Sequence, residues 1–230
     1  MRLLNAIKSD IRFQIKQGFY LIYLIITVMY LITLSLVPEN ILNIALPLIV
    51  FSDPSVLGLF FIGGIIMLEK GQGIIQVLVV SPLKTSEYII SKVVSLSIIS
   101  ALAGILITLF GTNSYPDWIL LTISIFLTSS IFTLCGIMIN AGCSNVNQYI
   151  IKTIPYMLLL VLPCFSLLGF KYSYLFYIFP SVSALKLMLG AFTGIATVEA
   201  VLLILFLLFV NYLLFLKSVK IFENKIVFNE

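Results

Sequence analysis

Long apolar runs alternate with short polar segments along this chain. Six runs are apolar almost throughout and end at Gly, Pro, Asn or a charged residue: residues 19–37, 46–68, 89–111, 118–140, 150–169 and 198–216. About 20 apolar residues in a helix are enough to cross the hydrocarbon core of a bilayer. The pattern therefore predicts an all-α integral membrane protein with six transmembrane helices.

The segment before the first run has a different pattern. Its apolar residues recur at every fourth position and its basic residues fall between them: Leu3, Ile7, Ile11 and Ile15, with Arg2, Lys8, Arg12 and Lys16. This spacing is typical of an amphipathic helix that lies in the membrane–water interface. We expect residues 1–17 to form such an interfacial helix, and a frayed basic tail is the alternative.

The connection between the second and third runs, residues 69–88, is too long to be a simple turn. Apolar residues between Ile74 and Val79 can form one face of a short helix, which the Ser81-Pro82 pair then ends. Such a helix can lie on the lipid surface or dock in a groove of a soluble partner and carry its movement into the attached spans. Both interpretations are open from the pattern alone.

The connection before the last run, residues 170–197, is also long, and Pro180, Gly190 and Gly194 interrupt its apolar stretch. A broken segment can enter a membrane only where protein or a water-filled cavity satisfies its backbone groups. We expect one or two short re-entrant or surface helices here, leading into the sixth span.

Composition supports the membrane assignment. Hydrophobic residues make up 61% of the 230 residues and charged residues only 10%, against about 25% charged residues in soluble domains. If the N-terminus lies in the cytoplasm, eleven basic residues face inward and two, Lys171 and Lys186, face outward. Because short cytoplasmic loops carry an excess of Lys and Arg, we expect a multi-pass membrane protein with both termini cytoplasmic.

The chain lacks the residues that most catalytic or metal sites need. It contains no histidine, and Cys135, Cys143 and Cys164 have no CxxC spacing. Neither a GxSxG nucleophile motif nor a GxxxxGK[ST] phosphate-binding loop is present. We therefore expect no enzymatic activity, cofactor or metal on this chain, and an energy source on another one.

Asp53 is the one acid well inside a predicted span. An intramembrane acid is a functional candidate, here for contact with a cationic or zwitterionic cargo in a substrate path. It can equally cap a helix that restarts at Pro54.

Small residues recur at intervals of three and four in the third predicted span: Ser97, Ser100, Ala101 and Gly104. They permit close approach of another helix. That helix can belong to the same subunit or to a second one.

Residues 69–92, EKGQGIIQVLVVSPLKTSEYIISK, resemble the signature of the permease subunits of type 2 ATP-binding-cassette exporters. The matching positions are Glu69, Lys70, Gly73, Leu78, Pro82, Tyr88 and Lys92. The chain departs from the family at Ile74 and Gln76, where a Thr and an acid are usual. Its order of elements is also similar, including the PSVSALKLMLGAFTG piece at residues 180–194, which resembles the family's short outer helices.

This resemblance implies that residues 1–230 form one type 2 transmembrane domain. It implies pairing with a second permease subunit, identical or not, and with two copies of a cytoplasmic ATPase that binds ATP and magnesium. ATP-driven movement of the ATPases would act on residues 69–88, a coupling helix, and on the N-terminal helix. The resemblance also implies a bacterial cell membrane as the location, with its bilayer as the remaining partner, and no nucleic acid is expected.

A narrower similarity concerns the cargo. The SDPSVLG run at residues 52–58, followed by FFIGGIIMLEKGQG, is similar to small permeases of firmicutes assigned to fluoroquinolone export. It implies export of an amphipathic drug or antimicrobial such as a fluoroquinolone. Alternatives are export of, or immunity to, a bacteriocin or cytolytic peptide, and a membrane scaffold or regulator that transports nothing. An ion-coupled carrier is disfavoured, because the predicted membrane interior offers one acid, Asp53, and no histidine.

Overall fold

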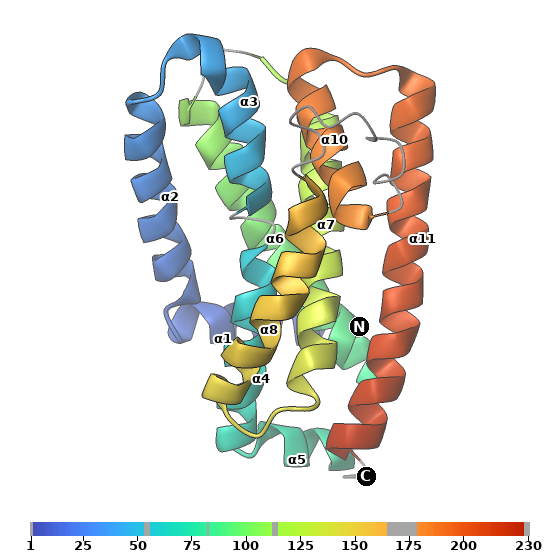
Figure 1. The fold of residues 1–230 in the computed structure, drawn as a ribbon. Coiled ribbons are helices and arrows are strands. Elements are labelled where there is room, and N and C mark those ends of the chain that lie inside the picture. Colours follow the sequence, from blue (N-terminus) through green and yellow to red (C-terminus); the bar gives the residue numbers. More distant parts are fainter. Residues whose placement is uncertain (1, 53–55, 82, 112–114, 165–178, 228–230) are drawn as a thin grey trace.

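The computed structural model describes residues 2–52, 56–81, 83–111, 115–164 and 179–227. Every regular element in these residues is helical. In chain order the elements are α1 (Arg2–Lys16), α2 (Phe19–Ser35), α3 (Glu39–Val50), α4 (Leu57–Gly71), α5 (Ile74–Val80), α6 (Thr85–Gly111), α7 (Trp118–Asn140), α8 (Val146–Val161), α10 (Pro180–Thr193), α11 (Thr197–Phe222) and the π-helical turn η3 (Glu223–Val227). The predicted all-α class is confirmed (Figure 1).

Four segments of the described chain are long and apolar enough to cross a membrane: Thr85–Gly111, Trp118–Asn140, Val146–Cys164 and Thr197–Lys225. The pair α1 and α2 adds a fifth if the two helices, bent by 65° at their junction, are counted as one span. The predicted number of six spans therefore remains a prediction.

The predicted second span, residues 46–68, falls on two helices among the described residues. They are α3, which has 12 residues and begins before the span at Glu39, and α4, which has 15. The sequence between Ser52 and Val56 contains a proline, a residue that cannot donate the backbone hydrogen bond that continues a helix. Each of the two helices alone is shorter than a membrane span.

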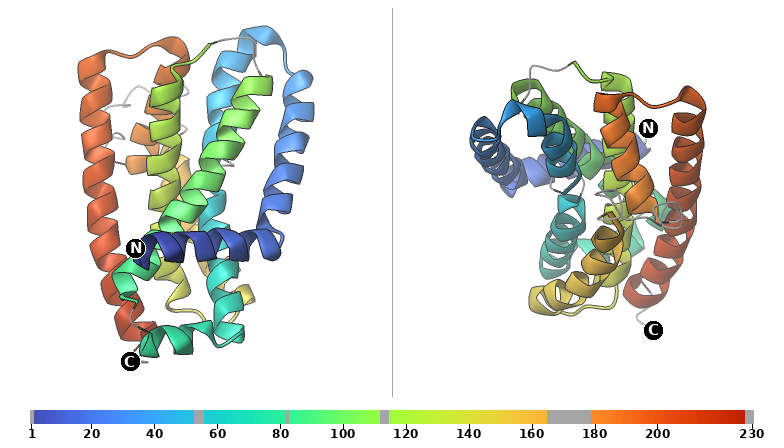
Figure 2. Two further views of the ribbon diagram at one scale, coloured as in Figure 1. Left: turned by 180° about the vertical axis from the view of Figure 1, so that it is seen from behind. Right: turned by 45° about the horizontal axis from the view of Figure 1, so that its top comes forward.

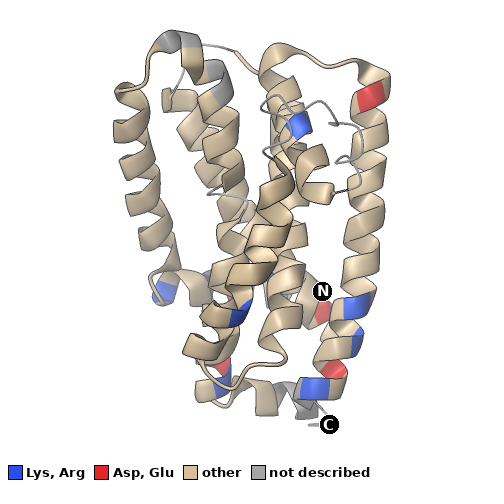
Figure 3. Cartoon of the chain, viewed as in Figure 1, with Lys and Arg blue, Asp and Glu red and all other residues tan. Residues whose placement is uncertain are grey.

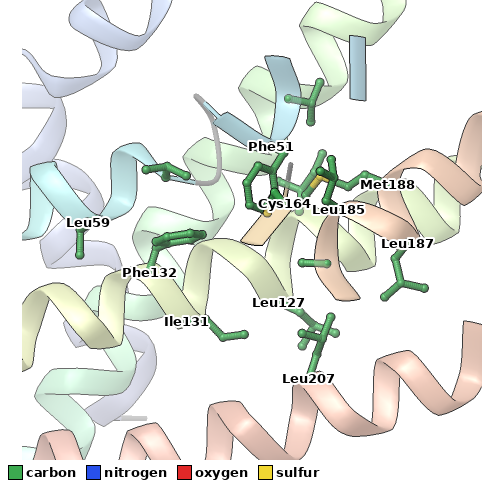
Figure 4. Close-up of a cluster of buried hydrophobic side chains, with 14 of the residues drawn as sticks. Phe51, Leu59, Leu127, Ile131, Phe132, Cys164, Leu185, Leu187, Met188 and Leu207 are labelled. Carbon is green, nitrogen blue, oxygen red and sulfur yellow. The ribbon is translucent and has the colours of Figure 1, made fainter. Parts of the chain in front are cut away.

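Helix α7 is the centre of the bundle and packs against α4, α6, α10 and α11 (Figure 1). The main apolar core surrounds it, with Phe132 edge-on to Phe51 of α3's C-terminal end, and Leu127 near Leu207 of α11 (Figure 4). The side of α6 that carries the small residues faces this core, since a Cβ on Gly104 would lie 2.6 Å from Ile125 of α7 and 3.3 Å from Val50. The small residues of the third span therefore serve packing within the subunit.

Two short helices lie across the bundle rather than along it. Helix α1 crosses in front of α4 and α6 in the left view of Figure 2, and α5 crosses the end of the bundle. The bend between α1 and α2 falls at Gly18, whose positive φ of 81° suits glycine. Both termini lie toward the end of the bundle that contains α1 and α5, and most Lys and Arg residues gather there (Figures 1 and 3).

Candidate functional site

A buried group of charges joins three helices where α1 crosses the bundle. The Lys92 Nζ atom of α6 lies 2.5 Å from Asp10 Oδ1 of α1 and also pairs with Glu69 Oε1, in the last turn of α4. Lys92 is 1% exposed, Glu69 3% and Asp10 9%. We call Asp10, Glu69 and Lys92, with their hydrogen-bond partners Tyr88 and Ser91, the buried ion network.

The partners of the network provide each carboxylate with a second donor. The Tyr88 hydroxyl donates to Glu69 Oε2 at 2.5 Å, and the Ser91 hydroxyl donates to Asp10 Oδ2 at 2.6 Å. One ammonium therefore faces two carboxylates, and neutral hydroxyls stabilise the excess negative charge. Desolvated charges need such additional hydrogen bonds, because pairing alone does not offset their loss of hydration.

Helical spacing explains how the sequence builds this network. Asp10 and Gln14 are four residues apart and share one face of α1, and Gln14 Nε2 donates to Ser95 Oγ of α6 at 2.8 Å. On α6, Ser91 and Lys92 are adjacent and lie three and four residues after Tyr88, and Ser95 follows them at four and three residues, so all four share one face. The Glu69 carboxylate stands at a helix C-terminus, where the helix dipole disfavours negative charge. Lys92 offsets this cost.

The resemblance to exporter permeases rests on seven residues in this region. The structure brings three of them, Glu69, Tyr88 and Lys92, together in the buried ion network. Their burial places them in contacts within the subunit, at the two ends of the 69–88 connection. Glu69 begins this connection and Tyr88 ends it, so the network joins its two ends to each other and to α1.

The other four residues lie apart from the network. Lys70 Nζ donates to the carbonyl of Cys143 in the α7–α8 turn at 3.2 Å, and partial burial lowers the pKa of Lys70 from its ordinary value. Gly73 has a positive φ of 71° immediately before α5. Leu78 lies in the α5 backbone. Pro82, like the path candidate Asp53, falls outside the described residues.

One side of helix α5 packs against the rest of the protein, and the other side is exposed. Ile75 is 6% exposed, whereas Val77 is 63% exposed. The helix packs against α4 and η3, and the ring of Tyr88, just beyond it, lies 5.2 Å from the ring of Phe222 at the end of α11. A displacement of α5 would therefore act on α4, α6 and the end of α11, and through the network on α1.

Helix α1 has the predicted amphipathic form, with its basic residues Arg2, Lys8, Arg12 and Lys16 all exposed. The pattern did not reveal that Asp10 and Gln14 are its buried residues. The sequence did contain a signal for this burial, because Asp10 and Gln14 are polar residues four apart on the side of the helix opposite its lysines. In the part of the chain that the structure describes, no three His, Cys, Asp or Glu side chains are grouped as a metal site would require.

The family model of fluoroquinolones export permease proteins matches residues 1–230. The chain belongs to this family. The predicted similarity to fluoroquinolone export permeases is thus confirmed, and family membership makes the chain a membrane transporter permease. Fluoroquinolones export permease proteins of Mycobacterium tuberculosis, from strains CDC 1551 / Oshkosh and ATCC 25618 / H37Rv, are each 24% identical over 196 residues. These residues cover 85% of this permease and 83% of each relative.

Proposed function

We propose that this permease is the membrane subunit of an ATP-driven exporter and forms half of the path for an amphipathic drug such as a fluoroquinolone. Six spans would be α2, the broken pair α3–α4, α6, α7, α8 and α11, with α1 in the interface and α10 as a short outer helix. The end of the bundle with both termini would face the cytoplasm, because most basic residues gather there.

The observation that carries the proposal is the attachment of the α4–α6 connection to α1 through Glu69, Lys92 and Asp10. The chain has no nucleotide-binding loop, so the energy must come from a separate ATPase. That ATPase can act on the exposed side of α5. Because a buried ion network resists separation of its members, movement of α5 would be passed to α1, α4 and α6 together.

A second permease subunit is supported by α8. It is the least apolar of the four helices long enough to span, yet most of its residues are exposed, including Lys152, Tyr156 and Leu159. Helix α11 is as little buried but strongly apolar, as expected for contact with lipid. We infer that α8 lies against protein in the assembled exporter.

Transport can be tested with the full chain and the ATPase that copurifies with it from native membranes. We expect fluoroquinolone uptake into inverted vesicles to require both proteins and ATP, and ATP hydrolysis to rise with the drug. A bacteriocin-like peptide in the same assay tests the alternative cargo. Recovery of no ATPase, in detergents that preserve other membrane complexes, would refute the exporter and favour a scaffold or regulator.

A direct test of coupling uses a change on the exposed side of α5. Val77→Asp places a charge where we expect the ATPase to bind, and Leu205→Asn on the exposed face of α11 is the control. Drug-stimulated hydrolysis should fall about tenfold or more for the first variant only, as expected for a charge at the centre of an interface. Equal coupling in both variants would place the contact elsewhere.

A further inference from the structure

A groove of about 270 Å³ lies between α2 and α6, away from the core around α7. Its floor is buried, with Tyr23 3% and Ala103 5% exposed. Its rim is open, with Leu24 59% and Phe110 74% exposed. The lining is almost entirely apolar, so the groove suits a narrow hydrocarbon chain.

The length of the groove matches one leaflet of a bilayer. Its lining runs from Tyr20 to Leu31 on α2 and from Ile99 to Phe110 on α6. At ~1.5 Å per residue this is a length of about 16 Å. Half of a hydrocarbon core of ~30 Å is a similar distance, and it is the length available to one acyl chain.

One end of the groove is positively charged. Helix α1 crosses that end before the chain turns into α2 (Figure 2). Lys8, Arg12 and Lys16 lie at four-residue intervals and are exposed on the side of α1 opposite Asp10. Among the described residues, none of these three forms a salt bridge with a carboxylate. Lys16 is two residues from the bend at Gly18, and therefore lies beside the start of the groove.

We propose that the α2–α6 groove binds one acyl chain of an anionic phospholipid, whose headgroup is held by Arg12 and Lys16. The leaflet is the one in which α1 lies. The proposal rests on the membrane placement of α2 and α6 given above, but not on transport. Apolar burial along the groove and attraction of the phosphate to the basic side chains act on the same molecule, which distinguishes this lipid from others around the protein.

The test uses the full chain in phosphatidylcholine vesicles, with a small fraction of phosphatidylglycerol or phosphatidylcholine that carries a photoreactive group in its acyl tail. Crosslinked peptides are mapped by mass spectrometry. We expect phosphatidylglycerol to label residues 20–31 and 99–110 about 25-fold more than phosphatidylcholine does, given roughly fivefold for each of the two basic residues near the surface. Residues 198–216 of α11 should be labelled equally by both lipids.

Two variants, each with a control, distinguish the contribution of the apolar groove from that of the basic side chains. Ala103→Phe fills the floor of the groove and should remove labelling of both groove segments. Leu205→Phe introduces the same side chain on α11 and should leave this labelling unchanged. The pair Arg12→Gln and Lys16→Gln should abolish the preference for phosphatidylglycerol and keep acyl labelling. Lys217→Gln with Lys220→Gln, exposed basic residues of α11, should leave the preference intact.

Equal labelling of the groove and α11 in every variant would overturn the proposal and indicate ordinary surrounding lipid only. Equal labelling of the groove by phosphatidylglycerol and phosphatidylcholine would also overturn it, because Arg12 and Lys16 would then hold no anionic headgroup. Failure of ATP-driven transport, with the labelling pattern as expected, would refute the exporter function and leave this lipid site standing.

Discussion

Ion pairs lie toward both ends of the helix bundle, and they differ in nearly every physical respect. Near α1, Lys92 has 1% of its side chain exposed and contacts two carboxylates from helices distant in sequence. Near the opposite end, Lys186 of α10 pairs with Glu199 of α11, the next helix, and their side chains are 24% and 44% exposed (Figure 3). Water can replace either partner of the second pair but no member of the first.

The difference indicates where the molecule must move as one body. Desolvated charges hold their partners at fixed positions because separation leaves a buried charge unpaired. The half-exposed pair permits separation at a cost of about 0–1 kcal/mol. The end that contains α1, α4 and α6 is therefore expected to transmit displacement, and the α10–α11 end is free to rearrange.

The largest expected effect comes from removal of the shared cation. Lys92→Met leaves the carboxylates of Asp10 and Glu69 buried and close together, and should lower the free energy of unfolding by about 3–5 kcal/mol. Unfolding in SDS, followed by circular dichroism of the purified chain, measures the change. Hydrogen exchange should also show loss of protection in residues 2–16, because α1 loses its attachment.

A combined variant distinguishes charge from shape at this position. Lys92→Met together with Asp10→Asn and Glu69→Gln removes every charge and keeps similar volumes. It should recover at least half of the stability lost by Lys92→Met alone, since neutral replacements of whole buried ion networks are often tolerated. If Lys92→Met is as stable as the unaltered chain, the carboxylates are not desolvated and the comparison between the two ends fails.

Neutralising either carboxylate of the network should have an intermediate effect on stability, and the two variants should affect different segments of the chain. Asp10→Asn weakens the attachment of α1, and Glu69→Gln weakens that of the α4–α6 connection. Each should cost about 1.5–3 kcal/mol, as for hydrogen bonds to charged groups. Exchange protection should fall in residues 2–16 for the first variant and in 74–80 for the second. The same pattern for both would mean that the network is one unit that opens as a whole.

Local sequence patterns predicted the helices better than their contacts. The run at residues 118–140 matches α7, Trp118–Asn140, because Asp117 caps its first turn and the apolar run ends at Asn140. Helix α6 begins at Thr85 rather than 89, because its first turn is polar and Glu87 Oε2 accepts from the backbone N–H of Lys84. Helix α11 continues to Phe222, beyond the predicted 216, because Lys217 and Lys220 extend it into the polar region.

The buried ion network was only partly visible in the sequence. Glu69, Tyr88 and Lys92 were identified by a resemblance, whereas no pattern in the sequence singled out Asp10. Its partner Lys92 is 82 residues away, and the periodicity within one segment does not indicate which distant helix that segment contacts. Glu69 and Lys92 are buried within the subunit, and the coupling of residues 69–88 to an ATPase stays a prediction.

The smallest effect is expected at the α10–α11 end. Lys186→Met removes a cation from a pair that is partly in water, so unfolding should change by no more than about 1 kcal/mol. The matched comparison is Lys92→Met, since both variants delete one lysine that pairs with a glutamate.

Addition of salt sharpens the contrast, because screening weakens exposed pairs and affects buried ones little. In the unaltered chain, salt should therefore loosen α10 from α11 in hydrogen exchange while residues 2–16 keep their protection. Equal sensitivity to salt at both ends would show that water reaches Lys92, and that neither end is held more firmly than the other.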